Sequence, residues 1–363
     1  MAQVLFSLRH SGRVAVLRLS SPPVNGLSLP LRKAIIDRVA EAHSHRSVQA
    51  LVLLGDGATF PAGADIAEFA LGRDGPAFAQ PHLPDVIHAL EQSRLPVTAA
   101  LHGTCLGGGL EMALGCHYRI AAPTARVGLP EVHLGLLPGA GGTQRLPRLT
   151  GVEFALQAMT SGAMVGASEA LHAGILDEVL GPETCRGGAE LEAAALAFVD
   201  ARVLGKDAPS AEARRVSARP VPAGHSSDVF DQWKQRVSGG STRGQTAPPA
   251  IVDAVRAAVE ASSFEEGLAE EGRLFSDLFA SPQAAAMQHM FFAERATGRG
   301  AVPKGVRPRE VSRVGIVGSG TMGSGIAMAM LDAGIAVTVV DTTQEALDAG
   351  MQRIEATYKR SSK

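Results

Sequence analysis

Three consecutive glycines, Gly107–Gly109, stand between a predicted strand at Pro96–Leu101 and an apolar helical segment beginning near Leu110. Glycine has no Cβ, so the backbone at this point can approach another group closely. The first N–H groups of a helix have no acceptor within the helix, and they lie at the positive end of its dipole. A strand–glycine–helix element is therefore suited to stabilising negative charge that develops on a phosphate or a carbonyl oxygen.

A second tight turn lies upstream, where the small residues of Phe60–Ile66 follow a predicted buried strand at Gln49–Gly55. This turn also leads into a short helical pattern. Two such turns that converge would offer two backbone N–H donors to one oxygen atom, which is the arrangement of an oxyanion hole.

Two glutamates accompany these turns. Glu111 lies on the first turn of the glycine-rich helix, and Glu131 follows Pro130 on a predicted loop after a short strand. Their apolar neighbours should raise both pKa values, which makes proton exchange near neutral pH easier. Either could instead be an ordinary surface or helix-start residue. Together, beside one oxyanion hole, they suit proton transfer at the α-carbon of a thioester, with addition or loss of water at the β-carbon.

The segments that carry these features resemble the crotonase (enoyl-CoA hydratase/isomerase) superfamily. They read GADIAEF, HGTCLGGGLEMALGCHYRIA and LPEVHLGLLPGAGGTQRLPRL, and the resemblance spans about residues 1–190. It implies an α/β fold built as a repeated ββα spiral with C-terminal helices, usually assembled as trimers. It also implies an acyl-CoA thioester as substrate.

The resemblance assigns roles to individual residues. Ala64 and Gly108 would supply the oxyanion-hole N–H groups, and Glu111 and Glu131 would be the catalytic carboxyls, with Glu131 as the acid that protonates the α-carbon. Further substrate-binding positions would be Ala62, Asp65, Ile66 and Gly107. Asp65 also fits a solvated or capping role.

Three functions stay open at this point. The glutamate pair favours enoyl-CoA hydration, which needs no cofactor and no metal. Δ3-Δ2-enoyl-CoA isomerisation is an accompanying or alternative activity, because one glutamate suffices for it. A chain that binds acyl-CoA without turnover is the non-catalytic alternative.

A second glycine motif begins after a predicted strand near Val311. Gly318, Gly320 and Gly323 open a helix, and a second predicted strand, Ala336–Val340, ends in Asp341. This spacing is typical of NAD sites, in which the glycines admit the pyrophosphate and the acidic residue binds the ribose. The order of segments resembles the multifunctional β-oxidation enzymes that join enoyl-CoA hydratase to 3-hydroxyacyl-CoA dehydrogenase.

Residues 311–363 amount to one βαβα piece of a Rossmann domain, whereas a dinucleotide fold has two halves. We therefore expect a truncated chain without dehydrogenase activity, in which NAD binds too weakly to measure. The expected division is a hydratase core at 1–190 and its helical part at 191–280. A linker helix with a basic linker at 281–310 and the incomplete NAD-binding piece at 311–363 follow.

Composition excludes some partners. A formal net charge of −2 gives no basic field for nucleic acid, and 4% aromatic residues provide few stacking platforms. No run is long and apolar enough for a membrane span.

We expect a monomer or homo-oligomer, with a trimer as the family's form. The cytoplasm is the expected compartment, and the peroxisome is the alternative if the full-length protein carries a C-terminal signal.

Overall fold

The computed structural model describes residues 2–69, 71–72, 75–297, 305–306 and 309–361. The chain separates into two compact units, Met1–Glu294 and Arg295–Lys363, which are described one at a time. Most of the expected basic linker, at residues 298–304 and 307–308, lies outside the described residues.

The first unit contains a six-stranded sheet with the order β1-β2-β3-β4-β6-β9. Its strands are β1 (Gln3–Arg9), β2 (Val14–Ser20), β3 (Ala50–Gly55), β4 (Val97–Leu101), β6 (Tyr118–Ala121) and β9 (Glu178–Val179). The first two form an antiparallel hairpin, as the alternation of apolar and polar residues over 3–9 and 13–19 predicts, and every other neighbouring pair is parallel. A mostly parallel sheet needs helices on both faces.

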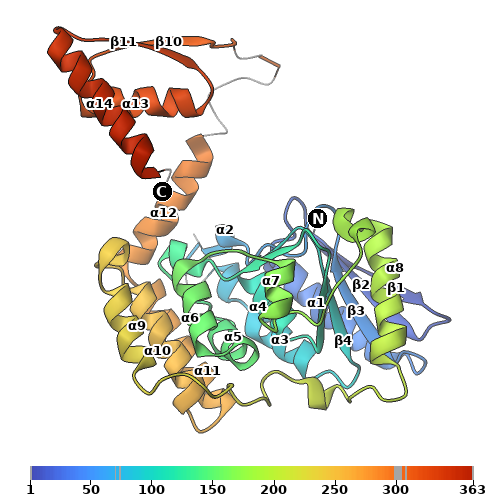
Figure 1. The fold of residues 1–363 in the computed structure, drawn as a ribbon. Helices are drawn as coiled ribbons and strands as arrows, with labels where there is room; N and C mark the ends of the chain where they lie inside the picture. The colour runs from blue at the N-terminus through green and yellow to red at the C-terminus, as the bar shows by residue number, and fades with distance from the viewer. Residues whose placement is uncertain (1, 70, 73–74, 298–304, 307–308, 362–363) are drawn as a thin grey trace. The chain divides into compact units, whose positions relative to one another are not determined.

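The buried strand β3 shows how both faces are covered. Its alternate residues Leu51 and Leu53 pack into the larger apolar cluster, with α1 (Leu29–Ser44) and α3 (Leu83–Glu91). Val52 and Leu54 point the other way and pack with α8 (Gly188–Phe198). Figure 1 shows α8 on the opposite side of the sheet from these helices. Because successive side chains of a strand point to opposite faces of the sheet, those of β3 enter two separate apolar cores, one on each face.

A smaller three-stranded sheet has the order β5-β7-β8 and holds the glycine turn. Its strands are β5 (Thr104–Leu106), β7 (Arg126–Gly128) and β8 (Val165–Gly166). The short strand β5 was not predicted; it leads directly through Gly107 into α4 (Gly108–Leu114). Nearby are α2 (Ile66–Phe69) and a short 3₁₀ helix, η2 (Glu131–Leu134).

Helices dominate after this sheet, as the sequence predicts. They are α5 (Gly142–Thr150), α6 (Val152–Ser161), α7 (Ala167–His172), α9 (Val229–Val237), α10 (Ala247–Glu260), α11 (Phe264–Phe279) and α12 (Pro282–Thr297). Short helical turns are η1 (Pro76–Phe78), η3 (Pro182–Arg186), η4 (Val199–Val203), η5 (Glu212–Arg214) and η6 (Gly240–Thr242). Helices α10 and α11 contact each other, and both contact α5.

The residue pattern of Ile251–Phe279 predicts helix, and the structure has two helices over this segment, α10 and α11. The helix breaks at Ala261, and Ser263 starts α11 as its N-cap, where the side chain accepts a hydrogen bond from Glu266 N at 3.1 Å. Serine competes for backbone hydrogen bonds and favours this position over a helix interior.

The second unit has the expected βαβα order. Parallel strands β10 (Arg313–Val317) and β11 (Ala336–Val340) alternate with α13 (Thr321–Asp332) and α14 (Gln344–Ser361). Ile316, Ala327 and Ile354 form its small apolar core. Throughout the described part of both units, every helix is too short or too polar to cross a bilayer.

Candidate active site

The two predicted turns meet in the structure. A Cβ atom added at Gly109 would lie 1.9 Å from the carbonyl oxygen of Pro61, and one added at Gly108 would lie 3.3 Å from Ala64 N. Gly107 has φ of 50° and is the N-cap of α4, so the helix begins at Gly108, two residues earlier than predicted. The absence of side chains at these positions is what lets the turns pack together.

Ala64 and Gly108 both keep their backbone N–H groups available. In the described residues, neither group donates to an acceptor within the chain. Two nearby donors are engaged, since Ala62 N donates to Val24 O at 3.1 Å and Gly107 N donates to Gly128 O at 2.8 Å. The unengaged N–H groups of Ala64 and Gly108 could both donate to one oxygen atom, which is what an oxyanion hole does.

The remaining predicted substrate positions lie in the same turn. Asp65 packs against Gly26, whose added Cβ would lie 3.7 Å from the Asp65 Cα. Asp65 O accepts a hydrogen bond from Glu68 N at 3.0 Å, and Ile66 begins α2. These contacts connect both residues to the turn that presents Ala64.

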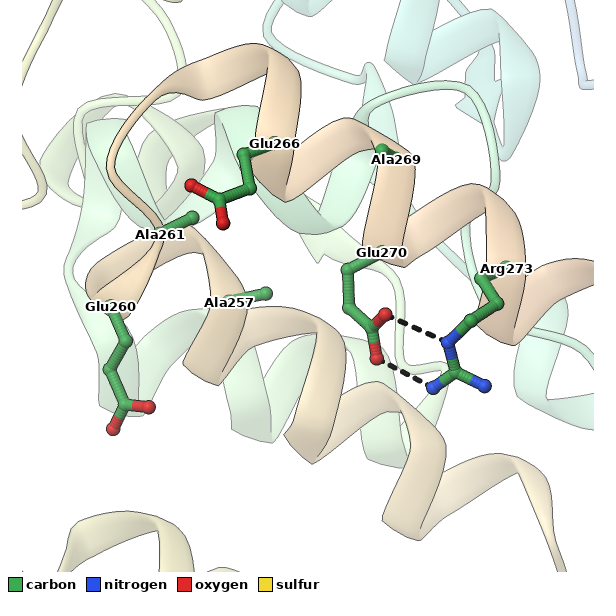
Figure 2. A pocket seen from close by; sticks show the side chains of 7 residues that line it. All are labelled: Ala257, Glu260, Ala261, Glu266, Ala269, Glu270 and Arg273. Carbon is green, nitrogen blue, oxygen red and sulfur yellow. Dashed lines mark hydrogen bonds and ion pairs between the residues drawn. The ribbon is translucent and has the colours of Figure 1, made fainter.

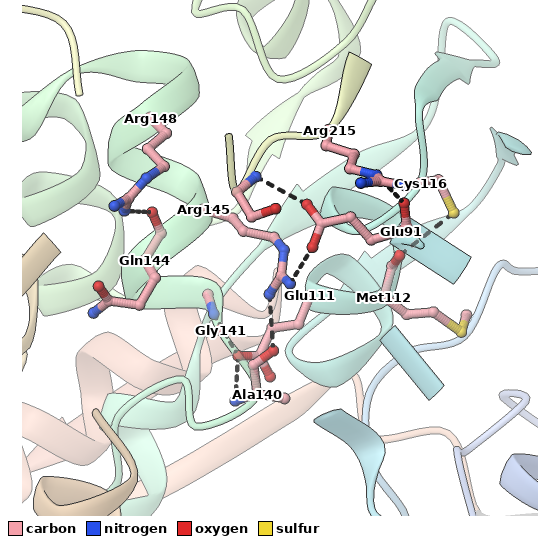
Figure 3. Close-up of polar contacts among 12 residues, drawn as sticks. Glu91, Glu111, Met112, Cys116, Ala140, Gly141, Gln144, Arg145, Arg148 and Arg215 are labelled. Atoms are coloured by element: carbon pink, nitrogen blue, oxygen red, sulfur yellow. Dashed lines mark hydrogen bonds and ion pairs between the residues drawn. The ribbon is translucent and has the colours of Figure 1, made fainter. Parts of the chain in front are cut away.

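Glu111 is 3% exposed and is held by backbone donors. Its Oε1 atom accepts hydrogen bonds from Ala140 N at 2.7 Å and Gly142 N at 2.8 Å. Figure 3 shows the carboxyl of Glu111 turned towards Ala140. Burial raises the pKa of Glu111, and the two N–H groups and the charge of Arg145 oppose that rise. The carboxyl is thus oriented by a fixed turn.

Glu131 opens η2 instead of lying on an irregular loop. Its Oε2 atom is buried and has no hydrogen-bond partner among the described residues. Its Oε1 atom lies 2.9 Å from the position of a Cβ added at Gly107. Burial, followed by the charge of Glu111, raises the pKa of Glu131 well above its ordinary value. The two glutamates therefore lie close enough to interact, on either side of the glycine turn.

A third buried carboxyl, Glu271 on α11, was missed by the sequence interpretation. It is 1% exposed and accepts hydrogen bonds from Gly141 N at 2.7 Å and Thr143 N at 3.1 Å. Burial, followed by the charge of Glu111, raises its pKa to about 8. Gly267 and Glu271 share the buried face of α11, one helical turn apart, but which face of this helix is buried only the structure shows.

An ion pair lies behind the Glu111 carboxyl. Arg145 Nη2 is 2.6 Å from Glu91 Oε2, and Ser217 N donates to the other Glu91 oxygen at 2.9 Å. Figure 3 shows Arg145 between Glu91 and the turn at Ala140. From the sequence, Arg145 could equally meet a phosphate of CoA or pair with a carboxylate at the surface; in the structure it pairs with the buried Glu91.

The groove drawn in Figure 2 lies elsewhere, between α10 and α11. It has a volume of about 540 Å³ and is lined by Ala257, Glu260, Ala261, Glu266, Ala269, Glu270 and Arg273. Glu270 pairs there with Arg273 at 2.6 Å. The adjacent glutamates of α11 thus lie on different faces of the helix, with Glu270 in this open groove and Glu271 buried beside the 140–143 turn.

The predicted NAD residues lie at the second unit's glycine turn. Gly318 has φ of 96°, and a Cβ added at Gly323 would lie 1.8 Å from Gly318 O. Gly320 is the N-cap of α13. Asp341 Oδ2 accepts a hydrogen bond from Ser319 N at 2.6 Å. The open helix start fits a pyrophosphate, and the carboxylate at the end of β11 fits a ribose.

Within the described residues, no group of three or more His, Cys, Asp or Glu side chains is placed to hold a metal ion.

Two sequence families match the chain. The family described as enoyl-CoA hydratase/isomerase matches residues 9–198, which is more than half of the chain. The NAD-binding domain of 3-hydroxyacyl-CoA dehydrogenase matches residues 313–363. These matches confirm the resemblance of each segment that the motifs indicated.

Relatives and solved structures agree with this division. The chain is 41% identical to a peroxisomal bifunctional enzyme of Danio rerio over 96% of its length, and 39% identical to that of Homo sapiens over 98%. It spans only 47% of each of those proteins. An enoyl-CoA hydratase/isomerase structure from Pseudoalteromonas atlantica matches with a TM-score of 0.53 at 23% identity, covering 80% of this chain and 97% of that one.

A second structure, an enoyl-CoA hydratase from Bacillus halodurans, matches with a TM-score of 0.54 at 19% identity, covering 79% and 99% of the two chains. At these identities the structures show the fold alone, and they confirm the crotonase-like α/β architecture. The chain belongs to the enoyl-CoA hydratase/isomerase family, and an NAD-binding segment of the 3-hydroxyacyl-CoA dehydrogenase type follows its hydratase region.

Proposed function

We propose that this chain hydrates trans-2-enoyl-CoA thioesters. The observation that carries the proposal is the pair of buried carboxyls, Glu111 and Glu131, beside the unengaged N–H groups of Ala64 and Gly108. A thioester oxygen that accepts from both N–H groups would have its developing negative charge stabilised. The substrate would then present its α- and β-carbons to the two carboxyls.

The environments of the two glutamates support different roles. Two N–H donors favour the ionised form of Glu111, which suits a base that removes a proton from water. Glu131 Oε2 lacks a donor, and its raised pKa suits an acid that keeps its proton until it is transferred. The water oxygen bonds to Cβ, one water proton passes to Glu111, and the Glu131 proton passes to Cα. Proton exchange between the carboxyls and solvent restores the starting state.

Replacement of each glutamate tests the proposal. Glu111→Gln and Glu131→Gln keep the side-chain shape and remove the base or the acid, so each should lower kcat for hydration of crotonyl-CoA by about 10²- to 10⁴-fold. The Glu270→Gln variant, altered in the groove of Figure 2, should keep the wild-type rate. Wild-type turnover in either active-site variant would remove that residue from the mechanism.

Δ3-Δ2-enoyl-CoA isomerisation is the second candidate activity. One observation favours it. The Oε2 atom of Glu131 is buried and has no hydrogen-bond partner among the described residues, so this carboxyl could take a proton from one carbon of the acyl chain and return it to another. Rates on 3-enoyl-CoA and 2-enoyl-CoA separate the activities. An isomerase that depends on Glu131 alone would survive Glu111→Gln, whereas the hydratase would not.

The relatives suggest a setting for this activity. Both bifunctional enzymes described above are peroxisomal by name, so we propose the peroxisome as the compartment, in place of the cytoplasm that the sequence favours. We also propose that Gly318, Gly320, Gly323 and Asp341 contribute to NAD binding in a protein that contains both halves of the dinucleotide fold. A homo-oligomer, such as a trimer, stays a proposal that sedimentation can test.

A further inference from the structure

Glu271 is a buried carboxyl that the hydration mechanism does not use. It lies on α11, outside the three motifs that identify the family segment. Its Oε2 atom accepts hydrogen bonds from both Thr143 N at 3.1 Å and Thr143 Oγ1 at 2.5 Å, and its Oε1 atom accepts from Gly141 N. Burying a carboxyl is costly unless its oxygens are satisfied, and here they are satisfied by the turn that also serves Glu111.

Four consecutive residues of this turn divide their N–H groups between two carboxylates. Ala140 and Gly142 donate to Glu111, whereas Gly141 and Thr143 donate to Glu271. The turn is therefore held from α4 on one side and from α11 on the other. A displacement of Glu271 would move the donors that orient Glu111.

The same face of α11 makes two further contacts with the site region. Phe275 lies one helical turn beyond Glu271, and its ring is 2.4 Å from the position of a Cβ added at Gly139. Phe279, one turn further, packs edge-on against Phe78 with ring centroids 4.8 Å apart. Glu271, Phe275 and Phe279 are spaced four residues apart and so lie on one face of α11. This face packs against the turn and against η1.

Among the described residues, the charged groups around Glu271 are two carboxyls and one arginine that already pairs with another glutamate. Glu111 and Glu131 face it from α4 and η2, and Arg145 faces it from α5. Arg145 is paired with Glu91 at 2.6 Å. Burial and the Glu111 charge raise the pKa of Glu271 to about 8, so Glu271 keeps its proton while Glu111 ionises. Its influence on Glu111 therefore passes through the shared turn and not through a negative charge.

We propose that Glu271 is a positioning residue for Glu111, which fixes the 140–143 turn from α11 and so holds the N–H groups of Ala140 and Gly142 on the Glu111 carboxyl. The kinetic consequences rest on the proposed hydratase function, whereas the effect on carboxyl titration does not.

Two substitutions test the anchor. Glu271→Asp is too short to reach Gly141 and Thr143 together, so kcat should fall about 10- to 100-fold. The N–H groups of Ala140 and Gly142 lower the pKa of Glu111, so their displacement should also move the acidic limb of kcat/KM to higher pH. Glu271→Gln keeps the length and one acceptor oxygen, so both effects should be smaller than in Glu271→Asp. The matched control is Glu270→Gln on the solvent face of the same helix.

Infrared titration of the buried carboxyls supplies a readout independent of turnover, with Glu111→Gln used to assign the Glu111 band. The band should titrate at higher pH in Glu271→Asp than in wild type or in Glu270→Gln. If wild type fails to hydrate crotonyl-CoA, the proposed function is lost while this titration still decides the role of Glu271. The positioning role is overturned if folded Glu271→Asp leaves the Glu111 band unmoved, or if it keeps the wild-type kcat.

Discussion

Arg145 and Glu91 form an ion pair with an Nη2–Oε2 distance of 2.6 Å, and both side chains are almost completely buried, at 4% and 3% exposed. The pair joins α5 to α3 behind the 140–143 turn, which donates hydrogen bonds to Glu111. Burial alone would raise the pKa of Glu91, but the Arg145 charge and the hydrogen bonds from Arg145 and Ser217 lower it overall. Each partner therefore depends on the other to remain charged in the interior.

Glu91→Gln should lower the free energy of unfolding by about 3–5 kcal/mol, because it leaves the Arg145 guanidinium buried without its counter-ion. Chemical denaturation at pH 7 measures this change. The control is Glu270→Gln, whose Arg273 partner is exposed, and which should leave stability nearly unchanged. Equal stability of the two variants would show that the buried pair is not a major contributor to the fold.

Gly109→Ala should damage both stability and activity. The added Cβ would lie 1.9 Å from Pro61 O, so the two turns that carry Gly108 and Ala64 would have to separate. We expect a loss of about 1–3 kcal/mol in the free energy of unfolding, as for other overpacked sites, together with a fall in kcat. Gly272→Ala is the control, since its added Cβ meets no atom within 4 Å. If Gly109→Ala behaves like Gly272→Ala, the packing of the two turns does not limit the site.

The rate of hydration should depend on pH with two limbs. The base Glu111 must be ionised, so kcat/KM should fall as the pH drops through its raised pKa. The acid Glu131 must be protonated, so kcat/KM should also fall as the pH rises through a pKa well above the ordinary value. Initial rates on crotonyl-CoA across the pH range test this. An acidic limb at the unperturbed glutamate value of about 4.3 would contradict the argument from burial.

Stability should also respond to Glu271. Its folded-state pKa is raised to about 8, so the folded chain holds this proton over a range in which the unfolded chain, with a pKa of about 4.3, has released it. The resulting stabilisation is fully present below the unfolded pKa and is lost as the pH rises through the folded pKa.

Urea denaturation between about pH 5 and pH 8 should accordingly show a shallower decline of stability in Glu271→Gln than in wild type. Glu270→Gln should keep the wild-type slope, because its hydrogen bond to Arg273 lowers the pKa of Glu270 and moves its titration below this range. Parallel slopes for all three proteins would mean that Glu271 ionises normally.

Local chemistry made one part of the site predictable from sequence. The glycines at 107–109 and the glutamates at 111 and 131 lie in short segments in which spacing and residue type indicate a turn, a helix start and buried acids. The same was true of the β1–β2 hairpin and the strand–glycine–helix order of the second unit. Short periodic segments carry enough information for these elements.

Glu271 could not be placed in the same way. It contacts Gly141 from α11, far along the chain, and only tertiary packing of the helices brings the two together. Glu270 and Glu271 are adjacent and chemically identical, yet one pairs in an open groove while the other enters the core. The break after Ala261 sets the rotation of α11, and neither that rotation nor the partner of Arg145 can be read from spacing alone.

The anchoring of the 140–143 turn by α11 has a consequence for how the chain loses activity under stress. Helix α11 joins the rest of its unit through α10 and α5, whereas the six-stranded sheet is covered by its own helices. Partial detachment of α11 would release two of the turn's four N–H tethers while leaving the sheet intact. Inactivation would then precede global denaturation, and amide exchange at Gly141 and Thr143 would accelerate before exchange in the central strands.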